Sequence, residues 1–228
     1  MTALIGRALP SVFVVSEAEW GASHVYEMFQ QAGFKRFTPM SKTERPDLTC
    51  FLGGEDVSPK LYGEEQLKGT HINERRDRRE IDTFEWAKGM PKVGICRGGQ
   101  LLNVLSGGAM WQHVDNHTGT HLALDLTDHE YYEVTSTHHQ MMIGGPNSDI
   151  LVVAWEASKR LSAKQREQPS YDTEVLFYKT TNSLCFQPHP EYKPGDTRDL
   201  FFRHIYMRWE MGTHTPFNQR DNGKEDLC

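Results

Sequence analysis

Cysteine is scarce in this chain, which has only four among its 228 residues: Cys50, Cys96, Cys185 and Cys228. No two of them stand in the CxxC spacing of a zinc ribbon, and a chain of this length does not need disulfide staples to hold its core. The sequence therefore does not indicate a secreted disulfide framework, and scattered thiols suit a reducing compartment.

Long apolar runs and an excess of positive charge are also lacking. No segment approaches the roughly 18 apolar residues of a membrane span, and no basic leader with a small-residue cleavage site marks a signal peptide. The formal net charge is -6, whereas nonspecific binding of nucleic acid requires a basic face. We therefore expect a cytoplasmic protein that binds neither nucleic acid nor a membrane.

The hydrophobic pattern predicts an α/β protein with a single domain over residues 1–211. Apolar segments that suit strands alternate with segments of helical periodicity in the first half of the chain. We expect strands at 11–15, 34–37, 48–52 and 93–95, and helices at 23–31, 74–88 and directly after Cys96. This alternation predicts a doubly wound, mainly parallel sheet flanked by helices, with sites at the carboxyl ends of its strands.

The second half of the chain has a different pattern. Short strands are expected at 131–135, 150–155, 173–178 and 183–186, which suggests a small antiparallel annex. Residues 196–211 have the spacing of a last helix, and residues 212–228 are expected to form a polar, disordered tail.

Cys96 lies between glycines where the strand 93–95 gives way to a helix. The pattern Gly94-x-Cys96-x-Gly98 is typical of a nucleophile elbow, because glycines remove the Cβ atoms that would clash in a sharp strand-to-helix turn. The partial positive charge at the N-terminus of the following helix favours a thiolate over a thiol. We interpret Cys96 as a nucleophile, although the pattern alone leaves open a small buried cysteine beside a glycine-rich turn.

A nucleophilic thiol needs a base, and the base needs a partner that fixes its tautomer. The segment QPHPE, residues 187–191, follows the predicted strand 183–186, so that His189 stands at a strand end between two prolines. Glu191 comes two residues later, where its carboxylate is able to reach the imidazole. We predict His189 as the base and Glu191 as its partner; without the elbow, His189 would be only one of 11 histidines.

Two further stretches are ambiguous. Gly53 and Gly54 follow the strand 48–52, where their amides are able to form a donor pair for an oxyanion, although this stretch by itself favours an ordinary glycine turn. The run ERRDRRE, residues 74–80, is typical of a solvated helix face with i,i+4 ion pairs and predicts at most a minor functional role.

Three histidines suggest a metal site that the local composition argues against. His113, His117 and His121 recur every four residues, a spacing that would align ligands along a helix. Gly119 and the polar residues around it do not favour a regular helix. We therefore expect no metal and no cofactor.

Taken together, these motifs resemble the class I glutamine amidotransferase superfamily, whose triad is Cys-His-Glu in that chain order. The segments GICRGGQ at 94–100 and QPHPE at 187–191 carry this resemblance. Further segments are similar to the γ-glutamyl hydrolase (peptidase C26) branch, which includes γ-glutamyl-γ-aminobutyrate hydrolases: GGEDVSPKLYGE at 53–64, Arg76-Asp77, Asn103-Val104, Gly107-Gly108 and STHHQ at 136–140. The likeness covers about residues 10 to 210.

The resemblance implies a flavodoxin-like core and hydrolysis of a γ-glutamyl amide without a metal. It implies that Cys96 is the nucleophile, His189 the base and acid, Glu191 its orienting partner, and the backbone amides of Gly54 and Arg97 the oxyanion donors. It also implies a substrate-binding set of Gly53, Gln100, Ser136 and His138, some of which contact the α-amino and carboxylate groups of the glutamyl moiety in relatives. Two departures, Pro188 in place of a common aromatic residue and a long stretch at 158–171, are expected to alter the leaving-group side of the pocket.

Two enzymatic functions fit this resemblance. In the first, the protein alone hydrolyses glutamine or another small γ-glutamyl compound; in the second, it is a glutaminase subunit that supplies ammonia to a separate synthetase. The hydrolase-branch motifs favour the first function. A catalytically degenerate binding module is less well supported, because Cys96, His189 and Glu191 are all present. Neither the particular substrate nor the oligomeric state is predicted.

Overall fold

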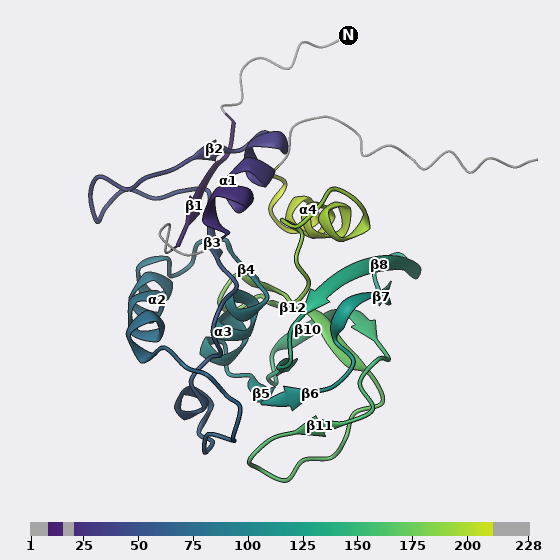
Figure 1. Ribbon diagram of the computed structural model, residues 1–228. Helices are drawn as coiled ribbons and strands as arrows, with labels where there is room; N and C mark the ends of the chain where they lie inside the picture. Colours follow the sequence, from purple (N-terminus) through teal and green to yellow (C-terminus); the bar gives the residue numbers. More distant parts are fainter. Residues whose placement is uncertain (1–8, 16–20, 212–228) are drawn as a thin grey trace, which may run out of the picture.

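The structure is a computed structural model, and it describes residues 9–15 and 21–211. Its centre is a sheet of nine strands in the order β2-β1-β3-β4-β13-β12-β10-β7-β8 (Figure 1). Five neighbouring strands are parallel: β1 (Ser11–Val14), β2 (Lys35–Arg36), β3 (Leu48–Phe51), β4 (Lys92–Ile95) and β13 (Ser183–Phe186). The polar tail predicted at 212–228 lies outside the described residues.

The parallel strands at the centre of the sheet form because their residues are apolar enough to be buried on both faces. Every residue of β3, β4 and β13 is buried, which is typical of parallel strands covered by helices on either side. The predicted strands 11–15, 48–52, 93–95 and 183–186 are confirmed to within a residue. These strands place three carboxyl ends next to one another.

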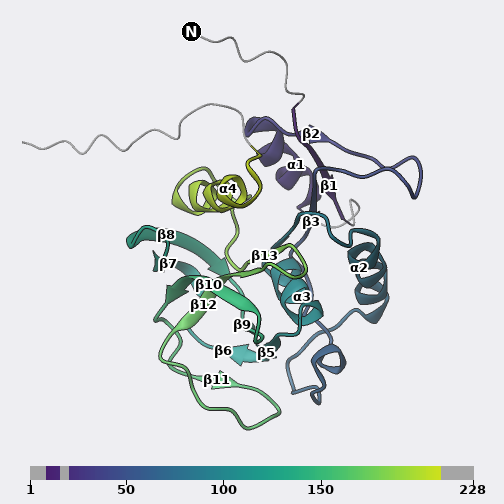
Figure 2. The same cartoon turned by 180° about the vertical axis from the view of Figure 1, so that it is seen from behind.

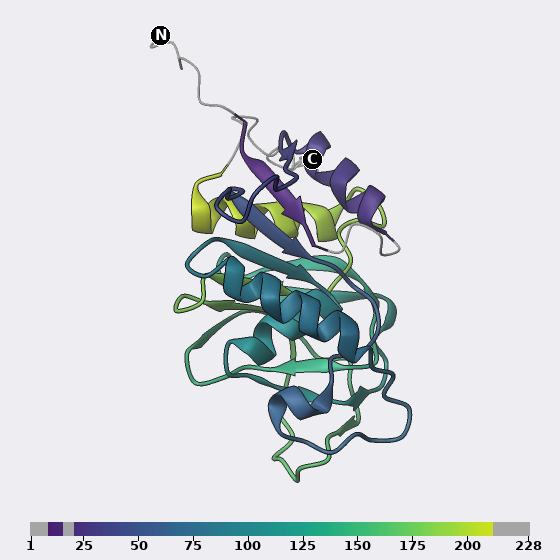
Figure 3. The ribbon, with the colours of Figure 1, turned by 90° about the vertical axis from the view of Figure 1, so that its left-hand side faces the viewer.

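Two helices cover each face of the parallel half. Helices α1 (Ala22–Gln31) and α4 (Asp196–Trp209) pack on one face, and α2 (Glu74–Trp86) and α3 (Arg97–Leu105) lie on the other (Figures 1 and 3). Alternation along the strands divides the core accordingly, since Val12 and Val14 face the first pair of helices and Phe13 faces the second. Within the described part of the chain, no helix is long and apolar enough to cross a membrane.

The antiparallel strands continue the same sheet from β13. They are β7 (Thr118–Asp125), β8 (Glu130–Thr137), β10 (Ser148–Ala154) and β12 (Asp172–Tyr178). Two small antiparallel sheets pair β5 (Ala109–Trp111) with β9 (Met141–Ile143) and β6 (His113–Val114) with β11 (Arg160–Leu161), and a 3₁₀ turn spans Pro59–Tyr62. The sheet of β6 and β11 lies at the end of the molecule opposite α1 and α4 (Figure 2). The α/β fold class is thus confirmed, but β7 was not predicted, because its THLALD pattern begins within a polar, histidine-rich stretch.

Glycines permit unusually close contact between α3 and the sheet. A Cβ atom on Gly98 would lie 2.3 Å from the carbonyl oxygen of Phe51, and one on Gly94 would lie 2.2 Å from the carbonyl carbon of Gly98. The backbone bends so sharply between β4 and α3 that Cys96 has a φ of 50° and a ψ of -113°. The strand-to-helix turn predicted at Cys96 is therefore present, and it requires glycine on either side.

We expect Gly98→Ala to destabilise the protein by about 1 to 3 kcal/mol, because the added methyl group meets rigid backbone rather than a movable side chain. Helix propensity alone predicts the opposite sign, a gain of up to about 1 kcal/mol. Urea unfolding measures the difference. Gly89→Ala is the control, since no atom lies within 4 Å of its added Cβ and only its φ of 77° disfavours alanine. Equal effects of the two substitutions would contradict the close contact at Gly98.

Candidate active site

The carboxyl ends of three adjacent parallel strands meet at the candidate site. β3 leads to Gly53 and Gly54, β4 leads to Cys96, and β13 leads to His189, with β4 between the other two strands. Gly53 lies against both other groups, since a Cβ there would be 3.2 Å from His189 Cε1 and 3.7 Å from Cys96 Cβ. The structure thus brings together residues that are far apart in the sequence.

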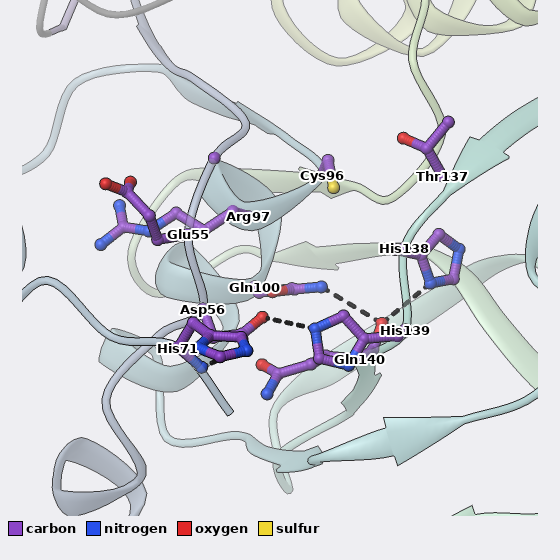
Figure 4. Close-up of a pocket in the computed structure, with 11 residues that line it drawn as sticks. Glu55, Asp56, His71, Cys96, Arg97, Gln100, Thr137, His138, His139 and Gln140 are labelled. Carbon is purple, nitrogen blue, oxygen red and sulfur yellow. Dashed lines mark hydrogen bonds and ion pairs between the residues drawn. The ribbon is translucent and has the colours of Figure 1, made fainter. Parts of the chain in front are cut away.

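Cys96 is almost fully buried, yet it lines two cavities. One, of about 220 Å³, is bounded by residues from four segments: Gly54, Glu55, Asp56, His71, Cys96, Arg97, Gln100, Thr137, His138, His139 and Gln140 (Figure 4). The other extends from Cys96 past Gly53 to His189, Glu191 and Tyr192. Gln187 Nε2 donates to Cys96 Sγ at 3.7 Å. The sulfur therefore faces space in which a small molecule fits.

His189 is held by a carboxylate and an aromatic ring. Its Nδ1 lies 2.7 Å from Glu191 Oε1, and its ring stacks on that of Tyr192 with centroids 4.3 Å apart. Burial by itself lowers the pKa of His189, but the charge and hydrogen bond of Cys96 and the Glu191 carboxylate raise it to about 11. His189 is accordingly an imidazolium near neutral pH, with Nε2 available because Glu191 occupies Nδ1. The contact with Tyr192 was not predicted.

Arg76 fixes the peptide between Gly53 and Gly54. Its guanidinium donates to the carbonyl oxygens of Gly53 and Leu52, at 2.8 and 3.2 Å. Because a trans peptide directs its C=O and N–H in opposite directions, the Gly54 N–H points away from Arg76. Arg76 also leaves no room for a side chain at Gly54, where a Cβ would lie 2.0 Å from the guanidinium.

The charged run 74–80 is a solvated helix face at only four of its seven positions, namely Glu74, Arg75, Arg78 and Arg79. Arg76, Asp77 and Glu80 are buried, and Arg97 from the turn after Cys96 forms ion pairs with both Asp77 and Glu80. Arg76 Nε lies 2.8 Å from Glu80 Oε1. Burial raises the pKa of Asp77 even though the Arg97 guanidinium opposes that rise. The i,i+4 pair is as predicted, but the three buried side chains are not, because alternation of charge along a helix does not reveal a partner of opposite charge on another element.

Only some of the predicted substrate-binding residues line the cavity beside Cys96. Gln100 and His138 line it, and Gln100 Nε2 donates to the Gln140 carbonyl oxygen at 3.2 Å. His138 donates from Nδ1 to the same oxygen at 2.8 Å, and burial lowers its pKa to about 3, which keeps its imidazole neutral. Ser136 is fully buried on β8 and is not part of the cavity lining, whereas its neighbour Thr137 is. Gly53 borders the second cavity.

A histidine pair at the rim of the cavity was also not predicted. His139 Nε2 lies 3.0 Å from Asp56 Oδ1, and His113 Nδ1 lies 3.3 Å from His139 Nδ1. His113 donates from Nε2 to the Lys68 carbonyl oxygen at 2.9 Å. The hydrogen bond to Asp56 raises the pKa of His139.

A group of metal-ligating side chains lies behind His138. His117, His121 and Glu174 each offer a ligand atom, and these atoms lie within 4.8 Å of one another. His113, the first of the three histidines that recur every four residues, is on β6 and pairs with His139 instead.

Sequence comparisons relate the chain to amide-cleaving proteins. The sequence model of the peptidase C26 family matches residues 43–146. A protein of Lactococcus lactis subsp. cremoris named as glutamine amidotransferase-like is 34% identical over 149 residues, which are 51% of this chain and 78% of that protein. A protein of Mycobacterium tuberculosis named as a glutamine amidotransferase is 43% identical over 70 residues, 29% of this chain and 23% of that protein.

Solved structures confirm the fold. A protein of Thermoplasma acidophilum, described as belonging to a GMP synthase, has a TM-score of 0.62 at 14% identity, over 90% of this chain and 96% of that one. The structure of PurLQS from Thermotoga maritima has a TM-score of 0.57 at 13% identity, over 88% of this chain and 99% of that one. At such identities the likeness concerns the fold alone.

The ion pair of His139 and Asp56 predicts a pH-dependent stability. Its contribution is fully present below the ordinary histidine pKa of about 6.5 and is lost as the pH rises through the raised pKa of the folded state. His139→Gln should therefore cost more at pH 5.5 than at pH 9, by at most about 1 kcal/mol because His139 is half exposed. Urea unfolding at both pH values measures this difference, and Asp56→Asn should reproduce it. A cost that does not change with pH would contradict the assignment.

Proposed function

The chain belongs to the class I glutamine amidotransferase-like superfamily, and from that premise we propose that it hydrolyses the amide bond of a γ-glutamyl compound. Family membership and the peptidase C26 match indicate an amide hydrolase or amidotransferase. The single observation that carries the finer proposal is the position of His189, whose Nδ1 lies 2.7 Å from Glu191 Oε1 and which lines the same cavity as Cys96. An imidazolium beside a cysteine is the arrangement that a thiolate nucleophile needs.

In the first half of the proposed reaction, a bond forms between Cys96 Sγ and the γ-carbonyl carbon, and the carbonyl oxygen takes up the negative charge. His189 then gives its Nε2 proton to the amine nitrogen, the C–N bond breaks, and a glutamyl thioester remains. In the second half, water adds to the thioester carbon while His189 takes its proton. The C–S bond breaks and releases the γ-carboxylate of glutamate and the Cys96 thiolate.

The oxyanion is proposed to bind the backbone amides of Gly54 and Arg97. The Arg97 amide is the first of α3, where the helix dipole favours negative charge, and the Gly54 amide is aimed by the contact of Arg76 with the Gly53 carbonyl. Arg97 is thus proposed to serve through its backbone, because its guanidinium is engaged with Asp77 and Glu80.

The glutamyl group is proposed to lie in the cavity lined by Gln100 and His138. Gln100 and the neutral imidazole of His138 both donate to the Gln140 carbonyl oxygen, which supports a shared polar surface in this cavity. Gly53 would pass beside the scissile bond, since it contacts both Cys96 and His189. The role of Ser136 stays a prediction from the family resemblance, and its buried position favours a contribution to the shape of the wall.

The test of this function is a panel of glutamine and γ-glutamyl amines incubated with the purified protein. We expect one γ-glutamyl amine to be turned over at about 1 to 10³ per second, and Cys96→Ala to reduce this rate by at least about 10⁴-fold with an unchanged circular-dichroism melt. Activity of Cys96→Ala near that of the wild type would overturn the mechanism. Glutaminase activity that appears only after cell lysate is added would instead favour a subunit that supplies ammonia to a synthetase.

The proposed role of Arg76 predicts a separate effect on the chemical step. Lysine at this position is not able to donate to Leu52, Gly53, Glu55 and Glu80 at once, as the guanidinium does. We expect Arg76→Lys to lower kcat by about 10- to 100-fold with little change in KM, because the Gly54 amide acts mainly on the transition state. Arg75→Lys, an exposed position on the same helix, is the matched control. An increase in KM alone would contradict this role.

A further inference from the structure

A buried cluster of ligating side chains from β12 and from the start of β7 lies beside His138. His117 precedes β7 and His121 lies within it. This segment does not favour a helix, so the four-residue spacing does not indicate a metal site on a helix. An extended chain, however, also places residues i and i+4 on one face. Glu174 comes from β12, which is separated from β7 by β10 in the sheet.

The distances in this cluster fit a divalent metal ion. Glu174 Oε1 lies 3.1 Å from His121 Nε2 and 3.4 Å from His117 Nδ1. Ligand atoms of a tetrahedral zinc site lie about 3.3 Å apart, given zinc–ligand distances of about 2.0–2.1 Å. The third pair of ligand atoms, from the two histidines, lies within 4.8 Å, so a small rotation of one ring would complete the triangle.

A carboxylate outside the cluster sets the tautomer of His117. Asp172 Oδ2 lies 3.1 Å from His117 Nε2, and because a carboxylate oxygen only accepts, Nε2 carries the proton. In the neutral ring the lone pair of Nδ1 then faces Glu174. Asp172 is itself held by Arg160 and by the backbone N–H groups of Glu156 and Ala157. A carboxylate that orients a histidine in this way is a recurring feature of metal sites.

Three buried atoms in this region lack a hydrogen-bond partner among the described residues. They are His117 Nδ1, Glu174 Oε2 and His138 Nε2. His138 donates from Nδ1 to Gln140, so its Nε2 carries a lone pair, and its ring lies 4.7 Å from that of His117. In Figure 4 this second nitrogen points away from Gln100. In these tautomers and with Glu174 ionised, all three atoms carry lone pairs and no proton. A single cation is able to bind several such atoms at once.

We propose that His117, His121 and Glu174 form a buried binding site for a divalent transition-metal ion of the zinc type, with His138 Nε2 as the candidate fourth ligand. Two imidazoles and a carboxylate suit zinc among the common divalent ions. The ion would join β7 to β12 and hold the imidazole of His138, which lines the cavity that contains Cys96. Its role would be structural, since the side chains of His117 and Glu174 are fully buried and that of His121 is 5% exposed. This site does not depend on the proposed hydrolase activity.

The experiment is a titration of chelator-treated, full-length protein with Zn²⁺ and Co²⁺. It uses Cys96→Ala as the reference protein, so that the thiol does not contribute a ligand. We expect one equivalent to bind with a Kd below about 1 µM, with the intense visible Co²⁺ bands of a four-coordinate site and a Zn²⁺-dependent increase in Tm. Absence of saturable binding up to about 100 µM metal would overturn the proposal.

Variants separate this site from other metal-binding groups. Glu174→Gln should weaken binding by at least about 100-fold, and Asp172→Asn, which only loosens the orientation of His117, by about 10- to 100-fold. His113→Asn is the control, because the His113 and His139 pair is the competing surface site, and it should leave the affinity within about threefold. Binding that survives Glu174→Gln but is lost in His113→Asn would overturn the assignment. Circular-dichroism melts confirm that each variant is folded.

Discussion

Direct backbone contact between α3 and the sheet is the constraint on which the rest of this structure depends. Cβ atoms on Gly94, Gly98 and Gly99 would all have a backbone atom within 3.0 Å, so any side chain there would push the helix away. With the helix so close, the chain turns from β4 into α3 through a single residue in an unusual conformation, Cys96. The sulfur is thereby presented at the sheet edge, where the loops after β3 and β13 also end.

Charge compensation between α2 and α3 supports this arrangement. Two arginines and two carboxylates, Arg76, Arg97, Asp77 and Glu80, are buried together, which would be costly for any one of them alone. Their mutual pairing positions two backbone segments at once, since Arg97 belongs to the turn after Cys96 and Arg76 holds the Gly53 carbonyl. The turn at Cys96 is therefore supported, in this chain, by a network of buried ion pairs between α2 and α3.

Two histidines near Cys96, His189 and His138, have pKa values shifted in opposite directions by their surroundings. Burial lowers the pKa of both, but at His189 the contacts with Cys96 and Glu191 outweigh burial, whereas at His138 burial prevails. One imidazole is consequently charged and suited to proton transfer, and the other is neutral and suited to hydrogen bonding or to metal ligation. The cavity lies between these two environments.

The sequence by itself determined the strand and helix order of the parallel half, the turn at Cys96 and the partnership of His189 with Glu191, because local periodicity and short spacings encode them. It did not reveal β7, the burial of Arg76, Asp77 and Glu80, or the meeting of His117 and His121 with Glu174. The burial of Asp77 and Glu80 depends on Arg97, at least 17 residues away, and the two histidines meet Glu174 from more than 50 residues away. Only the tertiary structure decided them, since a polar residue's burial is set by the opposite charge or hydrogen-bond partner that the fold brings to it.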